Sequence, residues 1–318
     1  MTNPRILVVR LGAMGDVIAA LPAVASLKHS IPHSRITWVI EPRWAPLLEG
    51  NPYVDAIVQL NRRSLTSVRG AWRDLRSGAR FDLAVDFQGL IKSALVAAAA
   101  RPERIIGFGA PHVREVPASW FYSTKVPLRS YHAVDRNLDL AAAAGASSIL
   151  RTFPLPAGQA EGNLPEGDFV LANPLAGWGA KQWPLDYYTK LAAMLRRDCG
   201  LPLVLNTPQP LSIEGCVNHV SGIPGLIHAT RRAAAVIGLD SGPLHLAAAL
   251  SKPGVAIFGP SDPARHGPYG KSLTVLRSPS AVTSYRRAAE PDASMRAITP
   301  DQVFATLEPI LASAAKRR

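Results

Sequence analysis

Short apolar runs alternate with helix-like segments along most of the chain, and this alternation constrains the fold more than any other feature. In the first half the runs cover 5–9, 35–40, 56–60, 83–87 and 104–108. Segments with helical apolar spacing separate them at 16–29, 63–78, 90–99 and 132–144. Buried strands joined by helices form parallel sheets that are covered on both faces. The pattern therefore predicts an α/β fold.

A stretch rich in proline and glycine at 154–167 interrupts the alternation, which then restarts. We expect further strands at 169–173, 203–206, 235–239, 255–258 and 273–276, and helices at 184–197, 242–250 and 300–315. The pattern predicts two doubly wound halves, an N-terminal domain of residues 1–158 and a C-terminal domain of residues 159–300. We expect the last helix, about 301–318, to pack back on the first domain. Ligands of such sheets bind beyond the carboxyl ends of the strands.

Composition excludes several classes of protein. A hydrophobic fraction of 47% excludes a disordered chain, and two cysteines exclude a disulfide scaffold or a four-cysteine zinc site. The apolar run near the N-terminus is too short for the core of a signal peptide. The longest apolar tract, 94–100, falls well short of the roughly 20 residues that span a bilayer. We expect the chain to stay in the cytoplasm.

The charge balance is strongly basic. The 35 Lys and Arg residues against 23 Asp and Glu give a net charge of +12. The excess is densest at 61–80, where six arginines face a single aspartate. This cluster is either a solvated basic face or a surface for an anionic partner, such as nucleic acid, a phosphorylated sugar or acidic lipid headgroups. Nucleic acid is disfavoured, because aromatic residues are not interleaved with the arginines and no base-reading motif is present.

The loop after the first predicted strand, at 11–16, contains the first candidate for chemistry. Gly12 and Gly15 permit a tight turn, and Asp16 is placed either to cap the following helix or to act as a general base. An NAD-dependent oxidoreductase is the competing interpretation, with Glu41 binding the ribose. The Gly-x-Gly-x-x-Gly spacing is absent, however, and Asp16 puts a carboxylate where the pyrophosphate would lie.

Three loops of the second half favour phosphate binding. In the loop at 238–245, Ser241 and Gly242 begin a helix with free backbone N–H groups, and His245 follows in the same turn. Lys181 follows the first strand of this half, and a third turn-rich loop covers 258–270. Together these loops predict a nucleotide site. No Asp-x-Asp string occurs, so the sequence contains no obvious holder for a metal ion that bridges a diphosphate.

Taken in order, these segments resemble a known family. The resemblance rests on Met14-Gly-Asp-Val17, Asp86-Phe-Gln-Gly-Leu-Ile-Lys-Ser-Ala94, His132-Ala-Val-Asp-Arg136, Lys181-Gln-Trp-Pro184, Asp240-Ser-Gly-Pro-Leu-His-Leu246 and Gly259-Pro-Ser-Asp-Pro263. The ordered set is similar to the lipopolysaccharide heptosyltransferase I family within glycosyltransferase family 9.

The resemblance implies a GT-B fold of two Rossmann-like domains, with the acceptor on the N-terminal domain and ADP-heptose on the C-terminal domain. It implies inverting transfer of L-glycero-D-manno-heptose to the Kdo of Kdo-lipid A, with Asp16 as the catalytic base and Lys181 stabilising the departing ADP. No cofactor is implied, and metal is not needed for the chemistry. Transfer of another sugar, or to another acceptor, remains the alternative.

The resemblance also implies the binding residues. The donor candidates are Gly15, Gly177, Gly179, Glu214, Asp240, Ser241, Gly242 and His245. The acceptor candidates are Arg62, Arg63, Gln88, Lys92, Arg114 and His132. Since the implied acceptor is an anionic lipid, we expect the arginines between 62 and 80 to dock the chain as a peripheral protein on the cytoplasmic face of the inner membrane.

Overall fold

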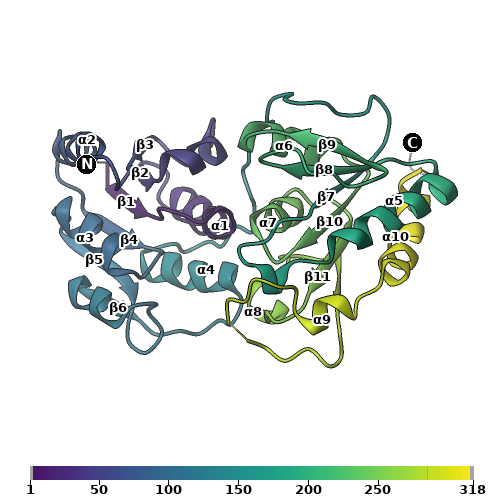
Figure 1. Ribbon diagram of the computed structural model, residues 1–318. Coiled ribbons are helices and arrows are strands. Elements are labelled where there is room, and N and C mark those ends of the chain that lie inside the picture. Colours follow the sequence, from purple (N-terminus) through teal and green to yellow (C-terminus); the bar gives the residue numbers. More distant parts are fainter. Residues whose placement is uncertain (1–2, 285, 316–318) are drawn as a thin grey trace. The chain divides into compact units, whose positions relative to one another are not determined.

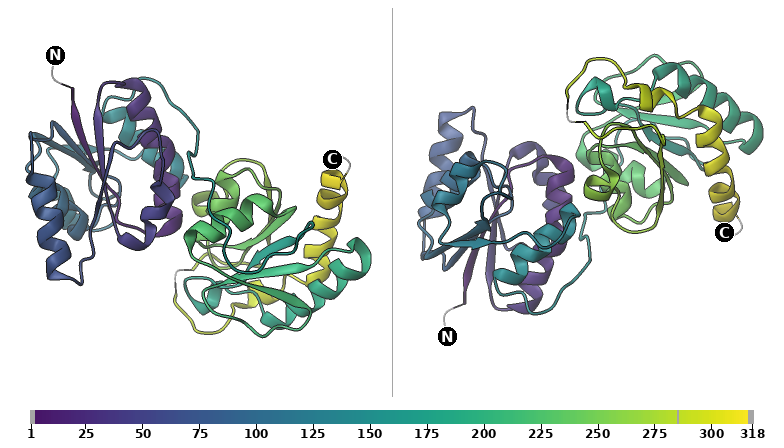
Figure 2. Two further views of the ribbon diagram at one scale, coloured as in Figure 1. Left: turned by 90° about the horizontal axis from the view of Figure 1, so that it is seen from above. Right: turned by 90° about the horizontal axis from the view of Figure 1, so that it is seen from below.

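The computed structural model describes residues 3–284 and 286–315, and the chain forms two compact units, Met1–Pro156 and Ala157–Arg318 (Figure 1). Each unit contains one parallel sheet of six strands with helices on both faces (Figure 2). The α/β architecture predicted from the sequence is thus confirmed. Within the described residues, no helix combines the length and the apolarity needed to span a membrane.

The first unit has the strand order β3-β2-β1-β4-β5-β6. Its strands are β1 (Arg5–Val9), β2 (Arg35–Ile40), β3 (Ala56–Gln59), β4 (Leu83–Asp86), β5 (Arg104–Phe108) and β6 (Thr124–Val126). Its helices are α1 (Met14–Ser30), η1 (Pro42–Leu48), α2 (Leu65–Arg76), α3 (Ile91–Ala99), η2 (Val116–Phe121) and α4 (Ala133–Ala143). Helices α2 and α3 contribute to one apolar cluster on the sheet, whereas α1 packs against α4.

The second unit repeats this order as β12-β11-β10-β7-β8-β9. Its strands are β7 (Val170–Asn173), β8 (Leu203–Thr207), β9 (Cys216–Val220), β10 (Ala235–Leu239), β11 (Gly254–Phe258) and β12 (Leu273–Arg277). Its helices are η3 (Gly179–Lys181), α5 (Leu185–Cys199), α6 (Ile223–Arg232), α7 (Gly242–Ala249), α8 (Pro263–His266), α9 (Ala293–Arg296) and α10 (Pro300–Ala315). One face carries α5 and α10, and the other carries α6 and α7.

The expected position of the last helix is wrong. Helix α10 packs in the second unit, where Val303, Leu307 and Leu311 are buried with side chains of α5, β10 and β11. The reason is the apolar stripe of α10, which the face of the second sheet beside α5 covers. Residues 316–318 of the predicted helix lie outside the described residues.

Each sheet reverses its direction of winding at one place, its switch point. This point lies between β1 and β4 in the first unit and between β7 and β10 in the second. At such a point two neighbouring connections leave on opposite faces, and their loops open a crevice at the carboxyl ends of the strands. The four strands at these places, β1, β4, β7 and β10, are fully buried or nearly so, which is usual for parallel sheets covered on both sides. The topology therefore singles out the loops after β1, β4, β7 and β10.

Candidate active site

Asp16 lies in the first turn of α1, directly after the loop that follows β1. The N-cap of α1 is Ala13, which makes no side-chain cap, so the interpretation of Asp16 as a capping residue is wrong. The Asp16 carboxylate forms ion pairs with Arg10 Nη2 at 2.6 Å and with Arg114 Nη1 at 3.4 Å. It is 33% exposed, so two guanidinium groups hold it in place while it remains open to a reactant.

Arg10, which sequence reasoning missed, directly follows β1 and has a nearly buried side chain. Its Nη1 donates a hydrogen bond to the carbonyl oxygen of Phe87, which directly follows β4, while its Nη2 contacts Asp16. Burial lowers the pKa of Arg10, and attraction to Asp16 opposes that effect. A buried cation of this kind needs its partners, so Arg10 ties the Asp16 carboxylate to the neighbouring strand.

The side chain of Gln88 is buried and is not placed to contact an acceptor substrate. Its side chain is only 4% exposed, and its Oε1 accepts a hydrogen bond of 2.8 Å from the N–H of Leu11. The prediction of Gln88 as an acceptor-binding residue is therefore not supported by its position. The side chain instead supports the loop after β1 that leads to Asp16.

A buried hydrogen-bond network around Asp86 fixes the position of Gln88. Asp86 Oδ1 accepts from the N–H groups of Gln88 at 2.8 Å and Gly89 at 3.2 Å, and Oδ2 accepts from the hydroxyls of Ser93 at 2.8 Å and Tyr122 at 2.7 Å. Burial raises the pKa of Asp86, although all four hydrogen bonds act to lower it. The network joins β4, α3 and η2 beneath the site.

We expect Asp86→Ala to destabilise the protein by roughly 3–5 kcal/mol, because it leaves several buried donors without an acceptor. Ser93→Ala removes one of the four donors to Asp86 together with the acceptor of the Leu90 N–H, and it should cost about 1–2 kcal/mol. Urea unfolding followed by circular dichroism measures both values. Equal losses for the two variants would contradict the central place of Asp86 in the network.

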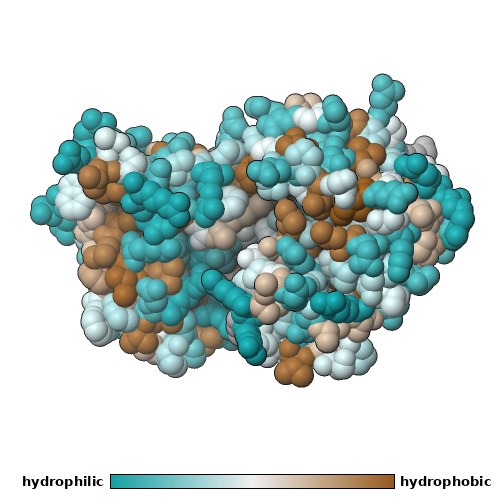
Figure 3. Space-filling view, in the orientation of Figure 1, coloured by the Kyte–Doolittle hydropathy of each residue, from teal (hydrophilic) through white to brown (hydrophobic). Residues whose placement is uncertain are grey.

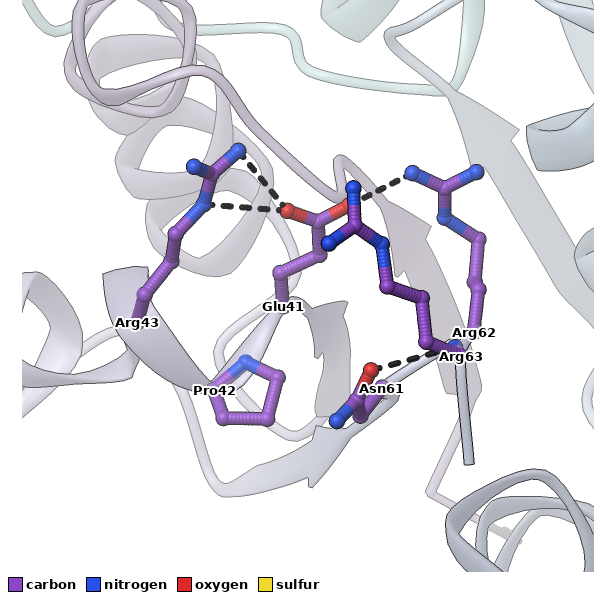
Figure 4. A pocket seen from close by; sticks show the side chains of 6 residues that line it. All are labelled: Glu41, Pro42, Arg43, Asn61, Arg62 and Arg63. Carbon is purple, nitrogen blue, oxygen red and sulfur yellow. Dashed lines mark hydrogen bonds and ion pairs between the residues drawn. The ribbon is translucent and has the colours of Figure 1, made fainter. Parts of the chain in front are cut away.

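A pocket of about 380 Å³ lies beyond the carboxyl ends of β2 and β3 in the first unit (Figure 4). Glu41 stands between Arg43 and Arg62, with 3.1 Å to Arg43 Nη2 and 2.8 Å to Arg62 Nη2. Arg63 lines the same pocket and makes no ion pair within the described residues. With three arginines against one glutamate, the pocket suits an anionic ligand. Because two arginines bind its carboxylate, Glu41 is poorly placed for the ribose of a dinucleotide.

The pocket should give a small pH-dependent contribution to stability. Burial acts to raise the pKa of Glu41, but hydrogen bonds and charges of Arg62 and Arg43 outweigh it, and the pKa lies below its ordinary value of 4.5. The stabilisation is therefore complete above pH 4.5 and is lost as the pH falls through the lowered pKa. Glu41→Gln should cost less than about 1 kcal/mol at neutral pH. Urea unfolding over a pH series should show this cost disappear in acid, and a cost that is constant with pH would contradict the ion pairs.

The other three acceptor candidates occupy three different positions in the first unit. Arg114, in the loop after β5, lies beside Asp16 as described above. Lys92 is in the first turn of α3, which begins beyond the carboxyl end of β4. His132 is the N-cap of α4, where its Nδ1 accepts from the N–H of Val134 at 3.2 Å. The structure thus brings the predicted acceptor side chain of Arg114 directly to Asp16.

In the second unit Lys181 and Asp240 meet across the switch point of the sheet. Lys181 ends η3 after β7, Asp240 follows β10, and the Lys181 ammonium forms an ion pair with Asp240 Oδ2. The ammonium also lies 3.9 Å from the centre of the Trp178 ring. Both partners of the ion pair are largely buried, so Lys181 is a fixed positive charge rather than a mobile surface lysine.

Helix α7 begins directly beside this ion pair. Ser241 is its N-cap and makes no side-chain cap, Gly242 is its first residue, and His245 follows in the opening turn. The hydroxyl of Ser241 and the side-chain amide of Asn173, at the end of β7, are buried without a hydrogen-bond partner in the described part of the chain. Buried polar groups of this kind are usual where a polar ligand or water binds. Asn173 gave no signal in the sequence.

The three remaining donor candidates of the second unit differ in position. Gly177 lies in the loop after β7 with open space where a side chain would stand, whereas Gly179 packs against the backbone of Ala289. Glu214 precedes β9, whose first residue pairs with Leu203 at the start of β8. It therefore lies at the amino-terminal edge of the sheet, opposite to Lys181 and Ser241. This position contradicts Glu214 as a donor ligand, because the loop between parallel strands has to return to that edge.

The donor candidate Gly15 belongs to the first unit, in the opening turn of α1 next to Asp16. Residues 3–284 and 286–315 contain no group of three or more His, Cys, Asp or Glu side chains arranged to hold a metal ion. The switch point of the first unit contains the ion pairs of Asp16 with Arg10 and Arg114, and that of the second unit contains the ion pair of Lys181 with Asp240.

Comparison with known proteins identifies similar chains. The chain is 28% identical over 307 residues to lipopolysaccharide heptosyltransferase 1 of Escherichia coli K12, covering 86% of this chain and 94% of the relative. It is 29% identical over 303 residues to the Pseudomonas aeruginosa PAO1 enzyme of the same name, covering 86% and 84%. Among solved structures, E. coli heptosyltransferase WaaC with ADP superposes with a TM-score of 0.78 at 24% identity, over 96% of this chain and 99% of that one.

The structure of E. coli ADP-heptose lipopolysaccharide heptosyltransferase II superposes with a TM-score of 0.80 at 23% identity, over 98% and 99% of the two chains. These similarities confirm the GT-B fold implied by the resemblance. Residues 68–220 and 221–292 match the family described as glycosyltransferase family 9 (heptosyltransferase), which overturns the dehydrogenase interpretation. The chain belongs to glycosyltransferase family 9, the heptosyltransferases.

Proposed function

We propose that the chain transfers L-glycero-D-manno-heptose from ADP-heptose to the Kdo of Kdo-lipid A during synthesis of the lipopolysaccharide inner core. The observation that carries the proposal is the Asp16 carboxylate, held open to solvent by Arg10 and Arg114 at the switch point of the first sheet. Two further findings support it. The relatives above are named heptosyltransferase 1, and WaaC has been solved with ADP and with ADP-2-deoxy-2-fluoro heptose.

In this reaction Asp16 acts as the general base. It accepts the proton of the acceptor hydroxyl as that oxygen attacks the anomeric carbon of the heptose. The new carbon–oxygen bond forms on the face opposite to ADP, the bond to the phosphate oxygen breaks, and ADP departs with the electron pair. A single displacement of this kind inverts the anomeric centre.

The second unit stabilises the departing ADP. Negative charge grows on the diphosphate as the bond breaks, and preorganised positive groups lower the energy of that state. Lys181 supplies a fixed ammonium, and the start of α7 at Ser241 and Gly242 supplies backbone N–H groups and the positive end of a helix dipole. His245 and Gly177 complete the donor side. These groups supply the charge that a metal ion would otherwise provide, so we propose chemistry without a metal cofactor.

The acceptor binds to the first unit through its negative charges. Arg62 and Arg63 of the pocket, together with Lys92, Arg114 and His132, would bind Kdo carboxylates and lipid A phosphates. Arg43 joins this set because it lines the same pocket. The enzyme would work as a peripheral protein on the cytoplasmic face of the inner membrane, with the arginines between 62 and 80 on anionic headgroups. Vesicle binding that ignores salt would contradict this electrostatic part of the proposal.

The test incubates purified protein with ADP-heptose and Kdo-lipid A and follows ADP release together with the mass of the lipid, with and without EDTA. We expect a gain of one heptose in both conditions. No gain, with ADP still raising the melting temperature, would retain a nucleotide-sugar enzyme and exclude this acceptor or this sugar. A gain that EDTA abolishes would contradict the metal-independent chemistry.

The same assay should be repeated with a second acceptor, heptosylated Kdo-lipid A. The chain is 26% identical over 360 residues to E. coli lipopolysaccharide heptosyltransferase 2, with 96% of this chain covered. The alternative is therefore transfer to a core that already carries one heptose. A mass gain on heptosylated Kdo-lipid A, and none on Kdo-lipid A itself, would replace the first proposal by this one.

A further inference from the structure

Helix α2 carries an apolar strip that the core of the first unit leaves uncovered. Leu65, Val68 and Trp72 are all exposed, and their spacing of three and four residues places them on one side of the helix. Leu65 is 77% exposed, whereas Ala71 and Leu75, one step further around the helix, are buried against the sheet. The strip is therefore not required for packing within the unit.

Helix α3 and the turn η2 extend this apolar surface. Ile91 and Leu95 are exposed on α3, and Val116 and Trp120 are exposed on η2, with Trp120 at 74%. Glu115 fixes η2 against the start of α3, because its Oε2 accepts from the N–H of Ile91 at 2.7 Å.

Helices α2 and α3 also lie together on one face of the sheet. Both contribute to the same apolar cluster, and Arg76 Nε at the end of α2 donates to the carbonyl oxygen of Ala99 in α3 at 3.0 Å. We call the exposed set the apolar face. It consists of Leu65, Val68, Trp72, Ile91, Leu95, Val116 and Trp120. In Figure 3 hydrophobic surface gathers over the part of the first unit where Figure 1 labels α3 and β5, beside hydrophilic surface.

A rim of positive charge borders the apolar face. Arg69, Arg73 and Arg76 continue around α2 from the apolar strip, and the Arg76 guanidinium lies 3.7 Å from the centre of the Trp72 ring. Arg62 and Arg63 precede the helix, and the only acidic side chain within 61–80 is Asp74. Arginine beside tryptophan and leucine on one helix is typical of segments that lie in the headgroup region of a membrane.

The positive charge beside the apolar face favours an anionic membrane over a second copy of the chain as its partner. In a symmetric dimer through this face, the arginines of one copy would oppose those of the other, and like charges at an interface cost several kcal/mol. An anionic bilayer complements both parts of the surface, with phosphates for the arginines and acyl chains for the apolar residues. Exposed apolar residues of the second unit come instead from separate segments, namely Leu175, Leu185, Val220, Val275 and Val282.

We infer that the apolar face inserts into the boundary between headgroups and acyl chains of an anionic membrane, with the arginine rim on the lipid phosphates. The inference rests on the proposed function in so far as the acceptor is a lipid. It assigns a separate task to the side chains of the apolar face, none of which belongs to the catalytic or acceptor groups. Insertion would bring the first unit to the surface from which the anionic sugar of the acceptor projects.

The first test measures binding to vesicles of phosphatidylcholine mixed with phosphatidylglycerol, in the absence of donor and acceptor. Leu65→Ser/Trp72→Ser should bind at least about tenfold more weakly than the wild type, because two inserted side chains are lost. Val282→Ser is the matched control, since Val282 is 79% exposed but belongs to the second unit. It should bind like the wild type. Equal binding of the double variant and the wild type would overturn the inference.

Three further measurements distinguish the ways in which the inference could fail. Brominated acyl chains should quench the fluorescence of the wild type, and Trp72→Leu/Trp120→Leu should lose that quenching. Binding without any quenching would mean docking by charge alone and would overturn insertion. A concentration-dependent dimer that Leu65→Ser/Trp72→Ser abolishes would make a second copy the occupant instead. Heptose transfer to a deacylated, water-soluble acceptor should be unchanged in the variants. If the wild type does not transfer heptose to this acceptor either, that result would contradict the proposed function and not the membrane-binding role of the apolar face.

Discussion

Replacing Asp16 by asparagine is expected to lower turnover by roughly 10²–10⁴ while ADP binds as it does to the wild type. The amide cannot accept the proton of the acceptor hydroxyl at the moment of attack. It still offers an oxygen to Arg10 and Arg114, so the buried cation keeps a partner and the loop after β1 keeps its shape. The measurement is the rate of ADP release at saturating donor and acceptor, beside a calorimetric titration with ADP.

Asp55→Asn provides a matched control for this prediction. Asp55 is 35% exposed, close to the value for Asp16, and forms an ion pair of 2.8 Å with Lys28 in the same unit. The same chemical change there should leave turnover unaltered. If Asp16→Asn turns over normally, Asp16 only supports the structure, and the base has to be sought among other side chains.

Replacing Lys181 by methionine should lower turnover by about 10²–10³ and weaken ADP binding at the same time. Methionine retains much of the length of the side chain against the Trp178 ring, but it removes the charge opposite the departing diphosphate. Loss of both quantities together is the result expected of a lysine that contacts the donor, whereas loss of turnover alone is expected of Asp16 as a base that acts on the acceptor. Calorimetry with ADP and the initial rate of transfer measure the two effects.

Two controls separate the direct role of Lys181 from its ion pair with Asp240. Lys190→Met removes an exposed lysine of α5 and should change neither quantity. Asp240→Asn breaks the same ion pair while it retains the ammonium. If Asp240→Asn lowered ADP affinity as much as Lys181→Met does, Lys181 would act only by positioning Asp240. Unchanged ADP affinity in Lys181→Met would contradict the donor site itself.

Most of the fold could be predicted because buried parallel strands have a clear signature. β1, β2 and β5 match their predicted ranges, since continuous apolar residues fill them. The edge strands β6 and β9 were missed. β6 has only three residues, and β9 includes Asn218 and His219 among its five, so neither shows an apolar run. Helix α6 was missed because Pro224 and Gly225 in its first turn look like a loop in the sequence.

The candidate site could be predicted only for residues whose role is indicated by the local sequence around them. Asp16 and Lys181 are predicted because each belongs to the connection between a strand and the next long helix, where the residue types alone suggest chemistry. Arg10 is not predicted, since its position depends on a hydrogen bond to Phe87, which is 77 positions away in the chain. Gln88 was assigned to the acceptor because nothing local indicates that its amide supports Leu11. Glu214 was misplaced because the sequence does not reveal where β9 begins.

The common strand order of the two sheets has a consequence for how enzymes of this design can diversify. Each unit buries its own apolar clusters and presents its own switch point, with the ion pairs of Asp16 on one and the ion pair of Lys181 on the other. If these two points serve acceptor and donor as proposed, a change in the loops of the first sheet would alter what receives the sugar without disturbing the residues that hold the nucleotide. Acceptor range and donor range can therefore evolve as separate traits, and chimeras that join one half to its counterpart from a relative are expected to combine them.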